Sequence, residues 1–220
     1  MGKLIFIFKN LFFSLSICRI LQIWELKKLK LSGSLIEFGA YTNQVKNFSY
    51  HLNKNNLNLY FSNIDNKNKK FLNINLEKKN KIKKRFNNIL IFNVLEHLIN
   101  LQFSILQLKK ILKKNGLVVG STPFLYRVHG APKDCFRFTS YILKKELSKN
   151  FHNVKVFDLG YGPFTACFSI ISDYTKIIPL LNILLIIFSI SLDKILNLFI
   201  KTDLKTIYPI AIFFIAKKIK

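Results

Sequence analysis

Short apolar runs alternate with stretches of helical periodicity along most of this chain. The runs that we expect to form strands lie at residues 35–38, 58–64, 71–76, 89–92, 117–120, 154–159 and 208–217. Between the fourth and fifth runs, Leu101, Ile105 and Leu108 recur at helical spacing, and residues 141–149 show a similar pattern. Strands that alternate with helices form parallel βαβ units, so the pattern predicts an α/β fold with a mostly parallel sheet.

A strongly apolar stretch at residues 166–200 precedes the last of these strands. We expect two helices there, with breaks near Pro179 and Asp193. Its most apolar part, residues 177–192, contains Pro179 and Asn182 and is shorter than the about 20 apolar residues of a typical membrane-spanning helix. We therefore expect a buried or membrane-surface helical hairpin rather than a membrane span.

The first 30 residues have a helical pattern and superficially resemble a signal peptide. Lys9 and Asn10 interrupt the apolar run, and no small-x-small cleavage site follows. Gly2 would suit myristoylation, but Phe6 replaces the Ser or Thr that this modification needs. We expect an amphipathic helix that packs on the sheet, with an interfacial membrane helix as the alternative.

Composition and charge narrow the class of protein. Half of the 220 residues are hydrophobic, which is enough for one sizeable core. We expect a single domain over residues 1–220, made of a helical segment (1–30), a core (31–165), an apolar helical insertion (166–205) and a final strand (206–220). The net charge is +24, but the lysines are scattered among asparagines and form no basic stripe. This argues against specific nucleic-acid binding and leaves a loose preference for acidic lipid.

The three cysteines, Cys18, Cys135 and Cys167, are too widely spaced for a disulfide framework or a cysteine metal site. Their spacing indicates a reduced compartment. We expect a cytoplasmic protein, with peripheral contact at the inner face of the membrane as a further expectation.

Polar clusters follow two of the expected strands. One spans residues 93–97, after the strand at 89–92, and the other spans residues 126–137, after the strand at 117–120. Ligands of open α/β sheets bind at the carboxyl ends of the strands. The two clusters are therefore the candidate functional sites of this chain.

Three segments carry a resemblance to a known family: LIEFGAYTNQ (35–44), NVLEHL (93–98) and TPFLYRVHGAPKDCFRFT (122–139). Together they resemble a class I S-adenosylmethionine-dependent methyltransferase, and the last is similar to the type 11 methyltransferase domain. The resemblance covers roughly residues 31–165, with a weaker echo in the final strand. It implies a Rossmann-like three-layer sandwich, whose mostly parallel seven-stranded sheet ends in an antiparallel strand. It also implies S-adenosyl-L-methionine as the methyl donor.

The resemblance assigns cofactor-binding roles to five residues: Glu37, Gly39, Asp65, Asn75 and Asn93. Glu37 and Gly39 stand where the family has the acid and first glycine of its glycine-rich turn, and Asp65 would accept hydrogen bonds from the ribose. Asn75 replaces the aspartate that addresses the adenine amine, and its carbonyl can still accept a hydrogen bond. Tyr41 replaces the second glycine, so its side chain either crowds the cofactor or points away.

The loop at residues 121–139 offers groups for the acceptor. His129 is the candidate general base, helped by Asp134 and Tyr126. Arg127 and Arg137 would hold a polar or anionic acceptor, because guanidinium suits phosphate and carboxylate. His97 and Tyr161 complete the expected acceptor site. The structural alternatives are a hydrogen-bonded His129, and an Asp134–Arg137 pair that only makes the loop rigid.

The pair Glu96 and His97 raises the question of a metal ion. One carboxylate and one imidazole make a thin ligand set, and Asn93 stands where a further acid would strengthen it. We expect no metal. The alternative roles are a favourable negative charge at a helix N-terminus for Glu96 and a packed, hydrogen-bonded histidine for His97.

These observations predict methyl transfer to an oxygen or nitrogen acceptor, with a small molecule, a glycan or a lipid-linked sugar as the acceptor. The alternative is a degenerate, non-catalytic relative that keeps the fold and acts as a membrane-surface or partner-binding module. Tyr41 and Asn75 favour the alternative, whereas the complete loop around His129 favours the enzyme.

Overall fold

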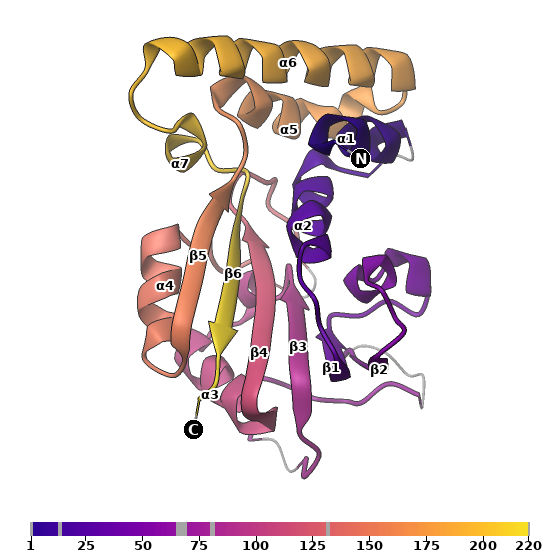
Figure 1. The fold of residues 1–220 in the computed structure, drawn as a ribbon, viewed down its shortest axis with the longest axis vertical. Coiled ribbons are helices and arrows are strands. Elements are labelled where there is room, and N and C mark those ends of the chain that lie inside the picture. Colours follow the sequence, from indigo (N-terminus) through magenta and orange to yellow (C-terminus); the bar gives the residue numbers. More distant parts are fainter. Residues whose placement is uncertain (1, 13–14, 65–69, 80–81, 131–132, 220) are drawn as a thin grey trace. The chain divides into compact units, whose positions relative to one another are not determined.

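The computed structural model describes residues 2–12, 15–64, 70–79, 82–130 and 133–219 (Figure 1). The helices are α1 (Lys3–Phe12), α2 (Ile17–Lys27), α3 (Leu101–Ile111), α4 (Ser140–Ser148), α5 (Pro163–Thr175), α6 (Pro179–Phe199) and α7 (Leu204–Ile207). The strands are β1 (Gly33–Phe38), β2 (Leu57–Ser62), β3 (Phe86–Phe92), β4 (Leu112–Pro123), β5 (His152–Leu159) and β6 (Ala211–Lys217). Three short 3-10 helices are η1 (Gln44–Lys46), η2 (Phe48–His51) and η3 (Leu95–His97).

The strands form one sheet in the order β2-β1-β3-β4-β6-β5. Strands β2, β1, β3 and β4 pair in parallel, and β6 runs in the opposite direction between β4 and β5 (Figure 1). The predicted mostly parallel sheet with an antiparallel last strand is therefore confirmed, but the described sheet has six strands rather than seven.

The missing strand is the one expected at residues 71–76. Only Leu72 pairs there, in an isolated bridge to Ser62. The side-chain oxygen of Asn75 accepts a hydrogen bond from the N–H of Glu77 at 2.8 Å. Such a local bond turns the backbone and competes with a strand ladder, so this asparagine-rich segment forms turns instead.

The centre of the sheet is built from the continuous apolar runs of β3 and β4. Ile89, Leu90 and Ile91 are buried, as are Val118 and Val119, which is the pattern of a parallel strand covered on both faces. Gly120 allows the closest approach, because a Cβ there would lie 2.2 Å from the carbonyl oxygen of Ile91.

The boundary between α3 and β4 differs from the prediction. The expected strand covered residues 117–120, whereas β4 begins at Leu112, directly after α3 ends at Ile111. The Nζ of Lys218 donates to the carbonyls of Lys109 and Leu112, both at 2.7 Å. A cation that satisfies the last carbonyls of a helix stabilises its end at that point, and Lys218 is distant in sequence.

The chain divides into two compact units. The first comprises Met1–Lys28, Pro123–Val128 and Asp158–Ile212, and the second comprises Leu29–Thr122, His129–Phe157 and Phe213–Lys220. The first is mainly helical, with α1, α2 and α5 to α7, and the second contains most of the sheet with α3 and α4. The expectation of a single domain stays a prediction.

In the first unit, the N-terminal segment forms two helices, and α1 contacts α2 and α6. Helices α5 and α6 pack against each other, and the expected break at Pro179 is where α6 begins. The expected break at Asp193 is wrong, because α6 continues to Phe199. The Asp193 carboxylate is buried and accepts hydrogen bonds from the N–H groups of Phe164 and Thr165, both at 2.9 Å. The N-terminus of α5 therefore stabilises the charge of Asp193, and α6 can continue past this residue.

Candidate functional site

The candidate site lies in the second unit, at the carboxyl end of the sheet, where the segments after β1, β3 and β4 come together. Asn93 directly follows β3 and adopts a left-handed backbone conformation, with φ 54°. Its N–H donates to the carbonyl oxygen of Ser121 in β4 at 2.8 Å. Asparagine tolerates this conformation better than most residues, so Asn93 turns the chain sharply at the strand end.

The end of β1 approaches the same turn. Gly39 also has a left-handed conformation, with φ 68°, and a Cβ there would lie 2.8 Å from Cγ2 of Val94. A side chain at position 39 would therefore clash with Val94, so only glycine fits this turn without a shift. Glu37, two residues before Gly39, is buried. Its carboxylate accepts hydrogen bonds from the N–H groups of Phe48 and Ser49 at 2.7 and 2.9 Å. Glu37 thus holds the start of η2 against β1.

The side chain of Tyr41, which follows this turn, lies largely in solvent. It is 53% exposed, and its backbone is held on both sides by Asn47, whose side chain accepts from the Tyr41 N–H and donates to the Tyr41 carbonyl. Of the two outcomes that the sequence left open for Tyr41, the structure favours a side chain that points away.

The structure does not test the cofactor roles predicted for Asp65 and Asn75. Asp65 lies outside the residues that the structure describes. Asn75 is described, but its side-chain oxygen is engaged by the Glu77 N–H. The cofactor roles of both residues stay predictions.

The central acid of the site is Glu96, in η3. Its side chain is fully buried, and neither carboxylate oxygen has a hydrogen-bond partner among the residues that the structure describes. Burial raises the pKa of this carboxyl to about 8, and the Arg137 guanidinium offsets only part of the effect. The backbone carbonyl of Glu96 accepts hydrogen bonds from the N–H groups of Cys135 and Phe136, at 2.8 and 3.1 Å. The loop after β4 is thereby tied to η3.

Asp134 organises this loop. Its carboxylate receives two hydrogen bonds from the Arg137 guanidinium and one from the backbone N–H of His129, and it lies 3.2 Å from Nδ1 of His129. The Arg137 guanidinium holds the pKa of Asp134 well below its usual range. Asp134 therefore does both things that the sequence left open: it pairs with Arg137 and it orients His129. Because Arg137 is engaged in this pair, it is less suited to hold an acceptor than predicted.

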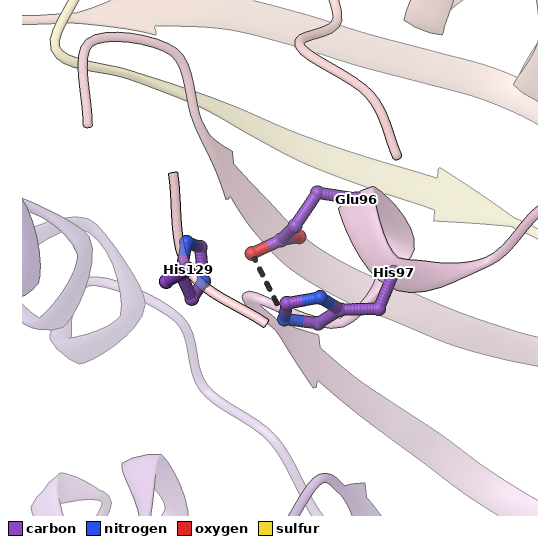
Figure 2. Close-up of side chains that lie close together, drawn as sticks. All are labelled: Glu96, His97 and His129. Carbon is purple, nitrogen blue, oxygen red and sulfur yellow. Dashed lines mark ion pairs between the residues drawn. The ribbon is translucent and has the colours of Figure 1, made fainter. Parts of the chain in front are cut away.

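Two imidazoles face Glu96 from different segments (Figure 2). The Nδ1 of His97 is hydrogen-bonded to the carbonyl of Lys133, and its Nε2 lies 3.9 Å from Oε1 of Glu96. The rings of His97 and His129 meet edge to face, with their centroids 5.0 Å apart. One ligand atom from each of Glu96, His97 and His129 lies within 4.8 Å of the other two.

The other predicted acceptor residues belong to the first unit. Arg127 is exposed and pairs with Asp173 at 3.5 Å. Tyr161 lies under the ammonium of Lys3, 4.6 Å from the ring centroid, and burial raises its pKa to about 12. The structure therefore brings together His97, His129, Asp134 and Arg137 in one unit, but it assigns Tyr126, Arg127 and Tyr161 to the other.

Sequence reasoning underrated Glu96. The pattern suggested a favourable negative charge on the first turn of a helix. The structure has a three-residue 3-10 turn instead, and the side chain is buried. The available signal was the apolar character of the flanking Leu95 and Leu98, both of which are also buried.

Comparisons with known proteins bear on the fold. No protein-family model matches the sequence, and no curated protein matches it. Among solved structures, a phosphoethanolamine N-methyltransferase 2 from Haemonchus contortus, in complex with S-adenosyl-L-methionine, superposes with a TM-score of 0.55 at 10% identity. The match covers 90% of this chain and 52% of that protein, so the chain spans about half the length of this similar structure. An S-adenosylmethionine-dependent methyltransferase from Archaeoglobus fulgidus superposes with a TM-score of 0.54 at 14% identity, over 92% of this chain and 93% of that one.

The chain has the class I methyltransferase fold. This confirms the predicted Rossmann-like architecture, whereas the type 11 family is not confirmed. The class I methyltransferase fold alone does not fix the reaction, because the [4+2]-cyclase SpnF superposes on this chain with a TM-score of 0.54 at 10% identity, over 91% of this chain and 80% of that one. The function must therefore be argued from the residues of the site.

Proposed function

We propose that this protein is an S-adenosyl-L-methionine-dependent methyltransferase that acts on an oxygen or nitrogen of a small-molecule or glycan acceptor. The observation that carries the proposal is the tight turn at the end of β1, where the left-handed Gly39 packs against Val94 with no room for a Cβ and the Tyr41 side chain is 53% exposed. A glycine turn of this kind lets the backbone approach an adenosine-containing cofactor at the carboxyl edge of an α/β sheet.

The residues of the second unit suit the proposed reaction. S-adenosyl-L-methionine, when bound, supplies an electrophilic methyl group on a sulfonium. Gly39 and Asn93 would hold it at the strand ends, with Asp65 and Asn75 as further proposed contacts and Glu37 supporting the turn from behind. His129 would take the proton that the acceptor loses as the new bond to carbon forms, and Asp134 keeps its imidazole in place. We propose His97 as a further acceptor contact. The acceptor roles of Tyr126, Arg127 and Tyr161, which belong to the first unit, and of Arg137, which is paired with Asp134, stay predictions.

Calorimetric titration with S-adenosyl-L-methionine and S-adenosylhomocysteine tests the proposal. The native protein should bind with micromolar affinity. Gly39→Ala should weaken binding at least tenfold, because its Cβ would clash with Val94 at a left-handed position and displace the turn, whereas Tyr41→Ala should change the affinity by less than about twofold. Absence of binding up to millimolar ligand, in a protein with a cooperative thermal transition, would favour the non-catalytic alternative.

We also propose that the protein contacts a membrane surface through α6. This helix is long and apolar enough to span a membrane by length and composition, and no other helix in the described ranges is. Its polar residues Asn182 and Asp193 face α5 and are buried, whereas its outer face exposes eight large apolar side chains: Leu180, Leu181, Leu184, Ile187, Phe188, Ile195, Leu198 and Phe199. The strong positive charge of the chain suits an anionic lipid surface.

Flotation with vesicles of phosphatidylserine and phosphatidylcholine tests this contact. The native protein should float with the anionic vesicles and be released by carbonate washing. The double variant Leu184→Ser, Phe188→Ser should stay at the bottom of the gradient, and Asn53→Ser serves as the surface control. Equal flotation of all three proteins would refute the role of α6, and resistance to carbonate would indicate a spanning helix instead of a surface contact.

A further inference from the structure

The buried Glu96 carboxylate has no hydrogen-bond partner among the residues that the structure describes. A buried ion without a hydrogen bond is costly, so such a group either keeps a proton or meets a cation. Neither Glu96 oxygen is hydrogen-bonded among the described residues, and the Arg137 guanidinium is already engaged by Asp134. The groups that face the carboxylate are imidazole nitrogens, which bind metal ions well.

His97 is oriented for ligation. The carbonyl of Lys133 accepts the proton of His97 Nδ1, which leaves Nε2 as the ring nitrogen that faces Glu96, 3.9 Å from Oε1. A backbone carbonyl in this position fixes the tautomer and the ring orientation of metal-binding histidines.

His129 is oriented in the same manner by a carboxylate. Asp134 lies 3.2 Å from its Nδ1 and is itself fixed by Arg137 and by the His129 backbone N–H. A carboxylate behind an imidazole raises the basicity of the ligand and holds the ring towards the ion. Two imidazoles from separate segments, each with an oxygen behind it, therefore converge on one buried carboxylate (Figure 2).

We propose that Glu96, His97 and His129 form a binding site for a divalent transition-metal ion, with Zn²⁺ as the preferred ion. Two imidazole nitrogens and one carboxylate oxygen are a known ligand set for zinc that leaves a fourth position for an exchangeable ligand. The expectation that the chain holds no metal counted Glu96 and His97 alone, and His129 supplies the third donor. Zinc binds its ligands at about 2.0–2.2 Å. The three ligand atoms, which lie within 4.8 Å of one another, must therefore draw together slightly as the ion enters.

The inference goes beyond the proposed function and does not depend on methyl transfer. With the ion bound, His129 is a ligand, so the proton-accepting role proposed above belongs to the ion-free protein. The open fourth position would take an exchangeable ligand such as water.

The test titrates chelator-treated protein with Zn²⁺ in competition with a chromophoric chelator. One equivalent should bind with micromolar or tighter affinity. Glu96→Gln and His129→Ala should each weaken binding at least tenfold, and Asp134→Asn should weaken it less, through the orientation of His129. His152→Ala removes an exposed imidazole, and Cys135→Ser removes a thiol whose Sγ lies 3.8 Å from the carbonyl of His97, and both variants should bind like the native protein.

The absorption spectrum of Co²⁺ in the same site gives a second readout. Visible bands of a four-coordinate ion should appear in the native protein and vanish in Glu96→Gln, whose thermal transition serves as the check on folding. Zn²⁺ binding that is equal in the native, Glu96→Gln and His129→Ala proteins, or binding that depends on Cys135 alone, would overturn the proposal. Calorimetry with S-adenosylhomocysteine on the same samples separates this failure from failure of the proposed function, since a protein that binds S-adenosylhomocysteine but does not bind Zn²⁺ refutes the metal site only.

Discussion

Replacing Asp193 tests how α6 is held against α5. The Asp193 carboxylate accepts three hydrogen bonds: from the N–H of Phe164 at 2.9 Å, the N–H of Thr165 at 2.9 Å and the hydroxyl of Thr165 at 2.7 Å. It therefore caps the N-terminus of α5 from a neighbouring helix, with its charge at the positive end of the helix dipole.

The magnitude follows from what each donor loses in Asp193→Ala. The Thr165 hydroxyl keeps the Gly162 carbonyl as an acceptor at 3.1 Å, and Phe164 is partly exposed, so water can replace the carboxylate there. The buried N–H of Thr165 has no substitute. One orphaned buried donor together with the lost charged bonds destabilises the protein by about 3 kcal/mol. For a chain of this size, that lowers the melting temperature by roughly 10 °C. Asp193→Asn keeps one acceptor oxygen and should lose about half as much.

Thermal and urea unfolding measure the effect, and amide hydrogen exchange locates it, since the Thr165 amide should exchange much faster in Asp193→Ala. The matched control is Asp173→Ala on α5, whose ion pairs to Lys176 and Arg127 are partly exposed and contribute at most about 1 kcal/mol. Equal melting temperatures for the two variants, with unchanged exchange at Thr165, would refute the cap.

Three further predictions concern the second unit. In chelator-treated protein, Glu96 holds a proton in the native state that the unfolded chain releases above pH 4.5, so the free energy of unfolding should fall by roughly 4 kcal/mol as the pH rises from about 4.5 to 8. Glu96→Gln should flatten this slope, and identical urea-unfolding slopes for both proteins would contradict the burial argument. Lys218→Met removes the cation that holds the carbonyls of Lys109 and Leu112 and should lower stability by about 1–2 kcal/mol, whereas Lys144→Met on exposed surface should be neutral by the same assay. Gly120→Ala should reduce soluble yield and cost about 3 kcal/mol or more, because its Cβ would overlap the Ile91 carbonyl, while Gly2→Ala, with open space around it, should match the native protein in expression and melting temperature.

The central sheet could be predicted from the sequence because its signal is local. The runs of β3 and β4 are continuously apolar, and a continuous apolar run flanked by polar residues is typical of a buried parallel strand. The prediction failed where distant groups decide the structure. Lys218, which directly follows β6, donates to the carbonyls at the end of α3. Asp193 is accommodated inside α6 because N–H groups of α5 donate to its carboxylate. Neither contact leaves a periodic signal in the sequence.

The candidate site shows the same division. The positions of Gly39 and Asn93 at strand ends follow from the order of strands and turns, and the structure has both residues in left-handed conformations. The convergence of His129 on Glu96 and His97 depends on how the loop after β4 folds back, which spacing does not encode. The pairing of Arg127 with Asp173 was missed because the loop appeared as one continuous motif, although its residues belong to two units.

The two halves of Glu96 serve different purposes. Its main-chain carbonyl anchors the loop after β4 through the N–H groups of Cys135 and Phe136. Every residue type has a main-chain carbonyl, so these two bonds do not require a glutamate at position 96. Its side chain alone faces the two imidazoles. The scaffold and the side-chain chemistry at this position are therefore separable: exchange of Glu96 for a neutral residue would remove the proposed metal ligand and leave the loop anchored in the same way.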